Sequence, residues 1–198
     1  MWGVYMLENI DLSKTIDKKE YKETLSRMEL RLSELQREAK RLNIPIIILF
    51  EGWGSSGKGT LINKLINPLD PRGFSVHTTN MFNIDELMRP FLWRFWIKTP
   101  PKGRIAIFDK SWYRKVMVER VDNRTESSEL ENYFEDISTF EKQLVDDGNI
   151  IIKFFLHISK KEQKKRFQEL EKDKAEEGSI LRPSIVFLSK LSTSTSFL

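Results

Sequence analysis

Cysteine is absent from this chain of 198 residues, and histidine occurs only twice. The lack of cysteine excludes disulfides, thiolate metal sites and cysteine nucleophiles. No apolar run approaches the roughly 20 residues of a membrane-spanning helix, and the amino terminus lacks the basic-then-apolar pattern of a secretory signal. We therefore expect a cytoplasmic protein that does not contact a membrane.

A large excess of charge of either sign is also missing. The 33 Lys and Arg residues exceed the 29 Asp and Glu residues by only four. This excess suits an anionic substrate but is too small for extended nucleic-acid binding, so we expect no nucleic-acid partner. With 39% hydrophobic and 31% charged residues, the chain has the composition of one folded domain, and its function must come from a local site.

The most informative stretch is a short apolar run, Ile46 to Phe50, that opens onto a glycine-rich turn. Gly52 and Gly57-Lys58 have the G-x-x-x-x-G-K spacing of a phosphate loop, and helical periodicity begins at Leu61. Glycines let backbone N–H groups converge on a polyanion, and the helix amino terminus adds partial positive charge. The alternative is a strand-to-helix turn carrying an ordinary surface lysine.

Lys58 is expected to supply a full positive charge for the terminal phosphates. Gly59 occupies the place where Ser or Thr normally holds Mg²⁺, and Thr60 would substitute only with shifted geometry. The expected phosphate-binding positions of the loop are Gly52, Gly54, Ser55, Ser56, Gly57, Gly59 and Thr60.

A second apolar strand, Arg104 to Phe108, ends in Asp109. A carboxylate at the carboxyl end of a parallel strand beside a phosphate loop can organise Mg²⁺, as in a Walker-B element. The alternative is that Asp109 or Ser111 simply caps the following helix, Trp112 to Val121.

Cationic side chains gather after this strand, where phosphates would arrive. Glu119 lies among them and either pairs with one of them or assists the metal. Arg72, in the turn before the strand Phe74 to Thr79, is equally consistent with a phosphate ligand and an exposed turn residue. The clustered cations are Lys110, Arg114, Lys115 and Arg120.

The remaining elements alternate in type along the chain. A long amphipathic helix is expected over Lys18 to Leu42, capped by Asp17 with Glu20 as capping-box partner, lying across the sheet rather than forming a coiled coil. His157 is expected to be structural. A helical, aromatic segment from Ile84 to Ile97, broken at Pro90, is expected to belong to the core or to an interface. Further expected elements are a loop from Asn123 to Glu131, a helix from Tyr133 to Val145 closed by Gly148, a buried strand from Asn149 to Ile158, and a helix from Ser159 to about Lys172.

Strands alternating with helices, with the phosphate loop after the first strand, predict an α/β fold. We expect a doubly wound parallel sheet with helices on both faces, in which four strands are legible.

Four sequence blocks in fixed order resemble the polyphosphate kinase 2 family, especially its polyphosphate:AMP phosphotransferase branch. The blocks are GWGSSGKGTLINKL, LDPRGFSVH, RPFLWRFW and IAIFDKSWYRKVMVERV. The resemblance implies a thymidylate-kinase-like P-loop fold that moves a terminal phosphoryl group between inorganic polyphosphate and AMP or ADP, with Mg²⁺. The domain boundaries expected with it are an arm over 1–17, the P-loop domain over 18–174 and a divergent tail over 175–198.

The resemblance also implies roles for individual residues. It makes Gly59 followed by Thr60 ordinary for the family, and Asp109 the Walker-B carboxylate and metal ligand, with Glu119 as a second metal residue. The catalytic set is then Lys58, Asp109, Lys110 and Arg120, with Arg72 and Arg114 on the phosphate path.

Three departures from the family pattern leave alternatives open. Gly54 stands where the family has Asp, and Lys110 stands where it has Arg, which keeps the charge but not the two-pronged donor. A basic lid is expected where this chain has a Ser- and Thr-rich tail, suggesting truncation or a reading-frame change near Lys174, or a short divergent strand.

The chain is accordingly either an active transferase or a degenerate structural or regulatory domain. It is expected to form a homo-oligomer or to be a fragment of a two-domain enzyme. An ATP-dependent nucleoside monophosphate kinase is a third, weaker interpretation.

Overall fold

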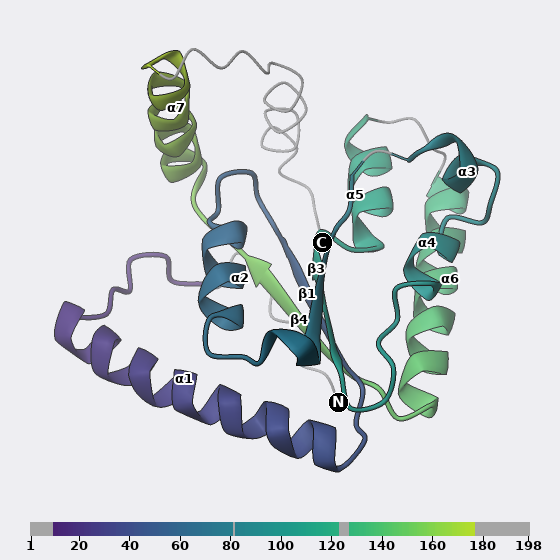
Figure 1. The fold of residues 1–198 in the computed structure, drawn as a ribbon. Helices are drawn as coiled ribbons and strands as arrows, with labels where there is room; N and C mark the ends of the chain where they lie inside the picture. Colours follow the sequence, from purple (N-terminus) through teal and green to yellow (C-terminus); the bar gives the residue numbers. More distant parts are fainter. Residues whose placement is uncertain (1–9, 81, 123–126, 177–198) are drawn as a thin grey trace.

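A four-stranded parallel sheet, in the order β2-β3-β1-β4, lies between two layers of helices (Figure 1). The computed structural model describes residues 10–80, 82–122 and 127–176. The strands are β1 (Ile46–Gly52), β2 (Phe74–Thr78), β3 (Ile105–Asp109) and β4 (Ile150–Leu156). The helices are α1 (Lys18–Arg41), α2 (Lys58–Ile66), the 3₁₀ turn η2 (Pro71–Gly73), α3 (Ile84–Leu87), α4 (Trp93–Trp96), α5 (Tyr113–Asp122), α6 (Ser127–Asp146) and α7 (Lys160–Glu176).

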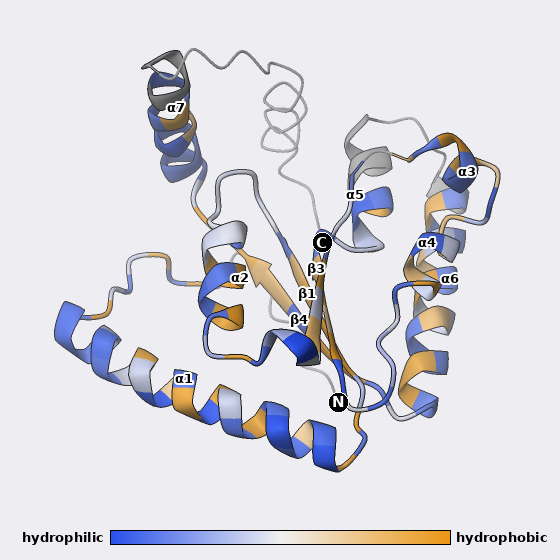
Figure 2. Cartoon of the chain, viewed as in Figure 1, coloured by the Kyte–Doolittle hydropathy of each residue, from blue (hydrophilic) through white to orange (hydrophobic). Residues whose placement is uncertain are grey.

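The central strand β1 supplies both layers of the core because successive strand side chains point to opposite faces. Ile47 and Leu49 pack with α4, α5 and α6, whereas Ile48 and Phe50 pack with α2 and with Leu32 of α1. The uninterrupted apolar run therefore reflects a strand buried on both faces. Figure 2 shows hydrophobic residues in the strands of the sheet between the helices. The predicted doubly wound architecture is confirmed.

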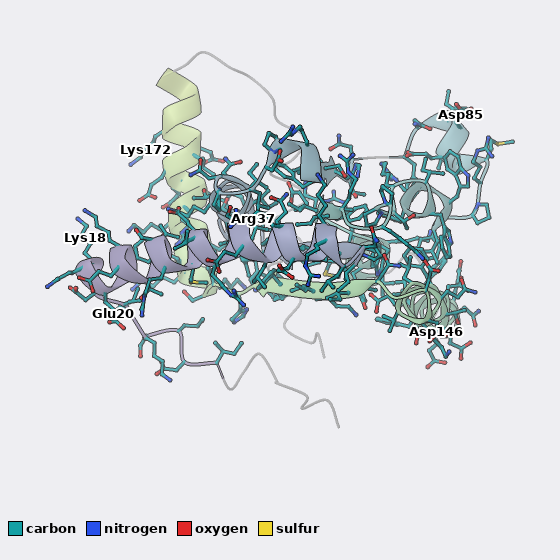
Figure 3. The ribbon with its side chains drawn as sticks, turned by 60° about the horizontal axis from the view of Figure 1, so that its bottom comes forward. Lys18, Glu20, Arg37, Asp85, Asp146 and Lys172 are labelled. Atoms are coloured by element: carbon teal, nitrogen blue, oxygen red, sulfur yellow. The ribbon has the colours of Figure 1, made fainter. Side chains whose placement is uncertain are left out.

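The predicted amino-terminal helix is confirmed as α1, with the Asp17 carboxylate accepting hydrogen bonds from the N–H groups of Lys19 and Glu20. Figure 3 shows α1 running along the molecule, with Lys18 and Glu20 at its outer end. The side-chain amide of Gln36 exchanges two hydrogen bonds with the backbone of Asp70 and so ties α1 to the turn before β2.

The aromatic segment around Pro90 forms two short helices, α3 and α4, as the interruption predicted. Phe95 is buried against Trp112, and the Trp96 ring meets Phe140 edge to face. Phe95 thus belongs to the core, with Phe91 and Leu92 partly buried against it, whereas Ile84 and Met88 are exposed, so the core assignment holds for part of the segment only. None of the helices in the described residues is long and apolar enough to cross a membrane.

Three local expectations are wrong. Helix α2 begins at Lys58 rather than Leu61. Helix α6 begins at Ser127, inside the expected loop, because exposed polar residues such as Glu129, Glu131 and Asn132 belong to the outer side of an amphipathic helix. Strand β4 was expected to be buried, but it lies at the sheet edge, where Ile150, Ile152 and Phe154 are exposed. No strand pairs with its outer side in the described part of the chain.

Candidate active site

The phosphate loop and Asp109 meet at the carboxyl edge of the sheet. Strands β1 and β3 are parallel neighbours, and Phe50 of β1 lies opposite Asp109 of β3. Because the loop leaves the carboxyl end of β1, residues distant in sequence converge at the position where α/β proteins bind their ligands.

The loop conformation depends on glycine at two positions. Gly52 has φ of +134°, and a Cβ added there would lie 2.3 Å from the carbonyl oxygen of Leu156 in β4. Gly57 caps α2 in the left-handed conformation, with φ of +96°, so that the first turn of α2 follows directly. The N–H groups of a first helical turn, with the helix dipole, form an anion-binding terminus.

Lys58 lies folded against this loop. Its ammonium group donates hydrogen bonds to the carbonyl oxygens of Gly52 at 2.9 Å and Trp53 at 3.0 Å. Burial lowers the pKa of Lys58, while the nearby carboxylates of Asp109 and Glu51 oppose that shift. The ammonium can exchange these neutral carbonyl oxygens for phosphate oxygens, to which charge-assisted hydrogen bonds are stronger.

Asp109 is the carboxylate best placed for a ligand. Its Oδ1 atom is buried and has no hydrogen-bond partner among the described residues. The alternative role, capping the start of the next helix, belongs to Ser111 rather than to Asp109. The Ser111 hydroxyl accepts a hydrogen bond from the N–H of Tyr113, the first residue of α5.

Glu51 is a buried carboxylate that sequence reasoning missed, although a charged residue ending an apolar strand is a visible signal. Its Oε1 atom accepts hydrogen bonds from the N–H and hydroxyl groups of Ser111, and burial raises the pKa of Glu51 despite those donors. Glu51 therefore ties the loop strand β1 to the turn that follows Asp109.

Two further cations adjoin these carboxylates. Burial lowers the pKa values of both Lys110 and Arg114, and Asp109 and Glu51 oppose the shift in each case. Lys110 takes a left-handed backbone conformation, with φ of 66°. With Lys58, three cationic groups surround two carboxylates, which favours the arrival of an anion.

Arg72 lies away from the phosphate loop, which favours the exposed turn residue over the phosphate ligand, the two alternatives that the sequence left open. It precedes β2 and lies at the amino ends of the parallel strands, whereas the phosphate loop lies at their carboxyl ends. Its guanidinium is 87% exposed and pairs with Asp70 at 3.0 Å.

The other predicted residues are placed less fully. Glu119 and Arg120 lie in α5, but their side chains are outside the described part of the structure. Gly59 and Thr60 are exposed on the first turn of α2, and the Ser56 hydroxyl is buried without a described hydrogen-bond partner. His157 accepts a hydrogen bond from the indole N–H of Trp53, consistent with its expected structural role.

A family model described as Polyphosphate kinase 2 (PPK2) matches residues 15–177. A polyphosphate:AMP phosphotransferase of Pseudomonas syringae is 36% identical over 84% of this chain and 34% of its own length. An NDP-polyphosphate phosphotransferase of Ruegeria pomeroyi is 30% identical over 87% of this chain and 57% of its own.

The solved structures that resemble this chain are also polyphosphate kinase 2 proteins. A putative polyphosphate kinase 2 of Pseudomonas aeruginosa superimposes with a TM-score of 0.86 at 33% identity, covering 94% of this chain and 41% of that one. Polyphosphate kinase 2 of Arthrobacter aurescens also gives a TM-score of 0.86, at 25% identity, covering 98% and 74%. The chain spans about a third of the polyphosphate:AMP phosphotransferases that it matches. With a family model that covers most of its residues, this chain belongs to the polyphosphate kinase 2 family.

Proposed function

We propose that this chain transfers a terminal phosphoryl group between inorganic polyphosphate and a nucleotide, AMP or ADP. The observation that carries the proposal is the convergence of three features at one edge of the sheet: the phosphate loop, Lys58, and Asp109, whose buried Oδ1 atom has no hydrogen-bond partner among the described residues. Membership of the family, whose named relatives act on polyphosphate and nucleotides, supports the same reaction.

Phosphoryl transfer requires donor and acceptor phosphates held in line while charge develops on the equatorial oxygens of the phosphoryl group. An oxygen of the acceptor phosphate bonds to the terminal phosphorus as the bridging P–O bond of the donor chain breaks. The backbone N–H groups of the loop bind and orient the chain. Lys58, Lys110 and Arg114 then neutralise the developing charge, and Lys110 does so as a single point charge rather than a two-pronged donor.

The metal belonging to this proposal is Mg²⁺, and the site fits it. The buried Oδ1 of Asp109 has no other described partner. No group of three or more acidic or histidine side chains that could hold a metal occurs in the searched, described residues. A single carboxylate is nevertheless enough, because Mg²⁺ commonly takes one or two carboxylates and completes its octahedron with phosphate oxygens and water. When bound, the ion neutralises phosphate charge.

The family resemblance adds two residues to the proposal. Arg120 follows Arg114 in α5 as a further catalytic cation, and Glu119 is a second candidate metal residue.

A second candidate is a domain that binds phosphate without transferring it. Gly54, where the family pattern has a carboxylate, lies in the loop itself and supplies no charge there. Such a domain is also consistent with a chain that spans about a third of the length of the polyphosphate:AMP phosphotransferases that it matches.

The deciding experiment is phosphoryl transfer by the purified chain with long-chain polyphosphate and Mg²⁺, offering AMP and ADP separately, beside a Lys58→Ala control. Turnover that disappears in the control supports the transferase. A folded chain without turnover supports the binding domain, and recovery on Gly54→Asp would identify the missing carboxylate as the cause. Offering ATP as donor separates a nucleoside monophosphate kinase, which would prefer ATP to polyphosphate.

A further inference from the structure

Three consecutive residues of the phosphate loop are each held by a side chain from the corner where β4 leads into α7. This corner rises beside the loop at the carboxyl edge of the sheet (Figure 1). The three hydrogen bonds, which we call the loop clamp, join Trp53 Nε1 to His157 Nδ1 at 2.7 Å, Gln163 Nε2 to the Gly54 carbonyl oxygen at 3.1 Å, and Arg166 Nη1 to the Ser55 carbonyl oxygen at 3.3 Å.

Gln163 is the central member of the clamp. Gln163 is only 4% exposed, so its side-chain amide is buried and acts on a ligand only through the loop that it holds. The C=O and N–H groups of a trans peptide point in opposite directions. By drawing the Gly54 carbonyl toward α7, Gln163 turns the N–H of Ser55 away from α7. The Gly54 carbonyl oxygen therefore points toward α7, and the Ser55 N–H donor points to the opposite side of the peptide.

Arg166 supports a residue with an unfavourable backbone. Ser55 has φ of 58°, a left-handed conformation that is unfavourable for a non-glycine residue. The Arg166 guanidinium pairs with Glu162 at 2.7 Å and reaches from there to the Ser55 carbonyl. The ion pair with Glu162 thus orients the Arg166 guanidinium, which in turn holds the carbonyl of Ser55.

Trp53 completes the clamp on the β4 side. Its indole N–H is held by His157, and its ring meets Phe155 edge to face at 5.7 Å. The clamp therefore links the loop to strand and helix at once, and it links residues more than 100 positions apart in the chain.

We propose that Gln163 is a positioning residue that, with Arg166 and His157, fixes the phosphate loop in its phosphate-binding conformation. The β4–α7 corner thereby sets the affinity of the loop for polyphosphate. This inference rests on the proposed function, in which the loop binds the polyphosphate donor.

The test compares Gln163→Ala with Gln168→Ala, a matched change at an exposed position of the same helix. Calorimetric titration with inorganic tripolyphosphate and Mg²⁺ should show binding about 3- to 10-fold weaker for Gln163→Ala, the loss expected for one hydrogen bond. Gln168→Ala should bind as the wild type does. In transfer assays the KM for polyphosphate should rise by a similar factor, while the KM for the nucleotide stays unchanged.

A second measurement follows the loop directly. Amide hydrogen exchange of residues 53–57 should accelerate in Gln163→Ala but not in Gln168→Ala. Arg166→Gln, which keeps a donor but removes the charge, should retain most of the affinity if Arg166 acts on Ser55 rather than on phosphate. If Gln163→Ala does not fold, Gln163→Met keeps its volume without the donor and carries the same expectation.

The proposal is overturned if Gln163→Ala or Gln163→Met binds tripolyphosphate like the wild type while Lys58→Ala does not bind. Unchanged exchange of the loop amides would overturn it equally. Failure of the wild-type chain to bind tripolyphosphate would contradict the proposed function instead, and the exchange measurement would still decide whether Gln163 orders the loop.

Discussion

Replacing Gly52 by Ala should destabilise the fold strongly, whereas the same change at Gly59 should not. A Cβ at position 52 would lie 2.3, 2.7 and 2.9 Å from the carbonyl oxygen, nitrogen and carbonyl carbon of Leu156. All three are backbone atoms of β4, and a real Cβ essentially never lies closer than 3.0 Å to another heavy atom, so the strand itself must move. At Gly59 nothing lies within 4 Å of the added atom.

The size of the effect follows from these contacts. Holding Ala at φ of +134° costs on the order of 1–3 kcal/mol, and an overpacked site costs typically 1–3 kcal/mol more. Gly52→Ala should therefore lower the free energy of unfolding by about 2–6 kcal/mol, a large part of the roughly 5–15 kcal/mol of a typical domain. Gly59 lies in helix α2, where Ala is more stable than Gly by about 0.5–1 kcal/mol, so Gly59→Ala should be neutral or stabilising.

Urea unfolding followed by circular dichroism measures both variants under identical conditions. Gly57→Ala should fall between them, because φ is +96° there but the nearest contact is a flexible guanidinium at 3.9 Å. If Gly52→Ala and Gly59→Ala have the same free energy of unfolding, the packing of β4 against the loop is not as described.

Three other predictions concern individual charges. Burial lowers the pKa of Lys58, which means that the charged form is costly to bury, so Lys58→Met should leave the midpoint of urea unfolding unchanged or raised. Calorimetry should show tripolyphosphate binding weakened by at least about tenfold in this variant. A variant that is destabilised but binds normally would contradict the prediction. Burial raises the pKa of Glu51, so the stability that this group contributes is present below its ordinary value of 4.5 and is lost as pH rises through the raised pKa. Glu51→Gln should remove that loss, and its unfolding free energy relative to the wild type, measured by urea titration, should increase with pH; a constant difference would refute the assignment. Arg72→Ala should leave the KM for polyphosphate unchanged, because Arg72 lies at the far edge of the sheet, and a tenfold rise would place it on the phosphate path after all.

The sequence by itself determined the parts of this protein that depend on local chemistry. Three features can each be recognised from a few consecutive residues: the apolar run before Gly52, the loop spacing to Lys58, and the strand ending in Asp109. Their order along the chain, strand then loop then helix, is sufficient to predict a parallel sheet and the edge at which the site forms. The structure confirms that architecture, and the matching family model confirms the family.

Only the tertiary structure decided how those parts are supported. Glu51 meets Ser111, and Gln163 meets Gly54, across separations of 60 and 109 residues. The charge of Glu51 at the end of an apolar strand marks the residue as unusual but does not name its partner, and no local pattern distinguishes Gln163 from an ordinary polar residue of a helix. The exposure of β4 depends on its place in the strand order, which its own apolar sequence does not specify. The position of Arg72 also depends on the tertiary structure. Arg72 lies in the turn before β2, and only the parallel direction of β2 in the sheet shows that this turn is at the edge opposite the phosphate loop.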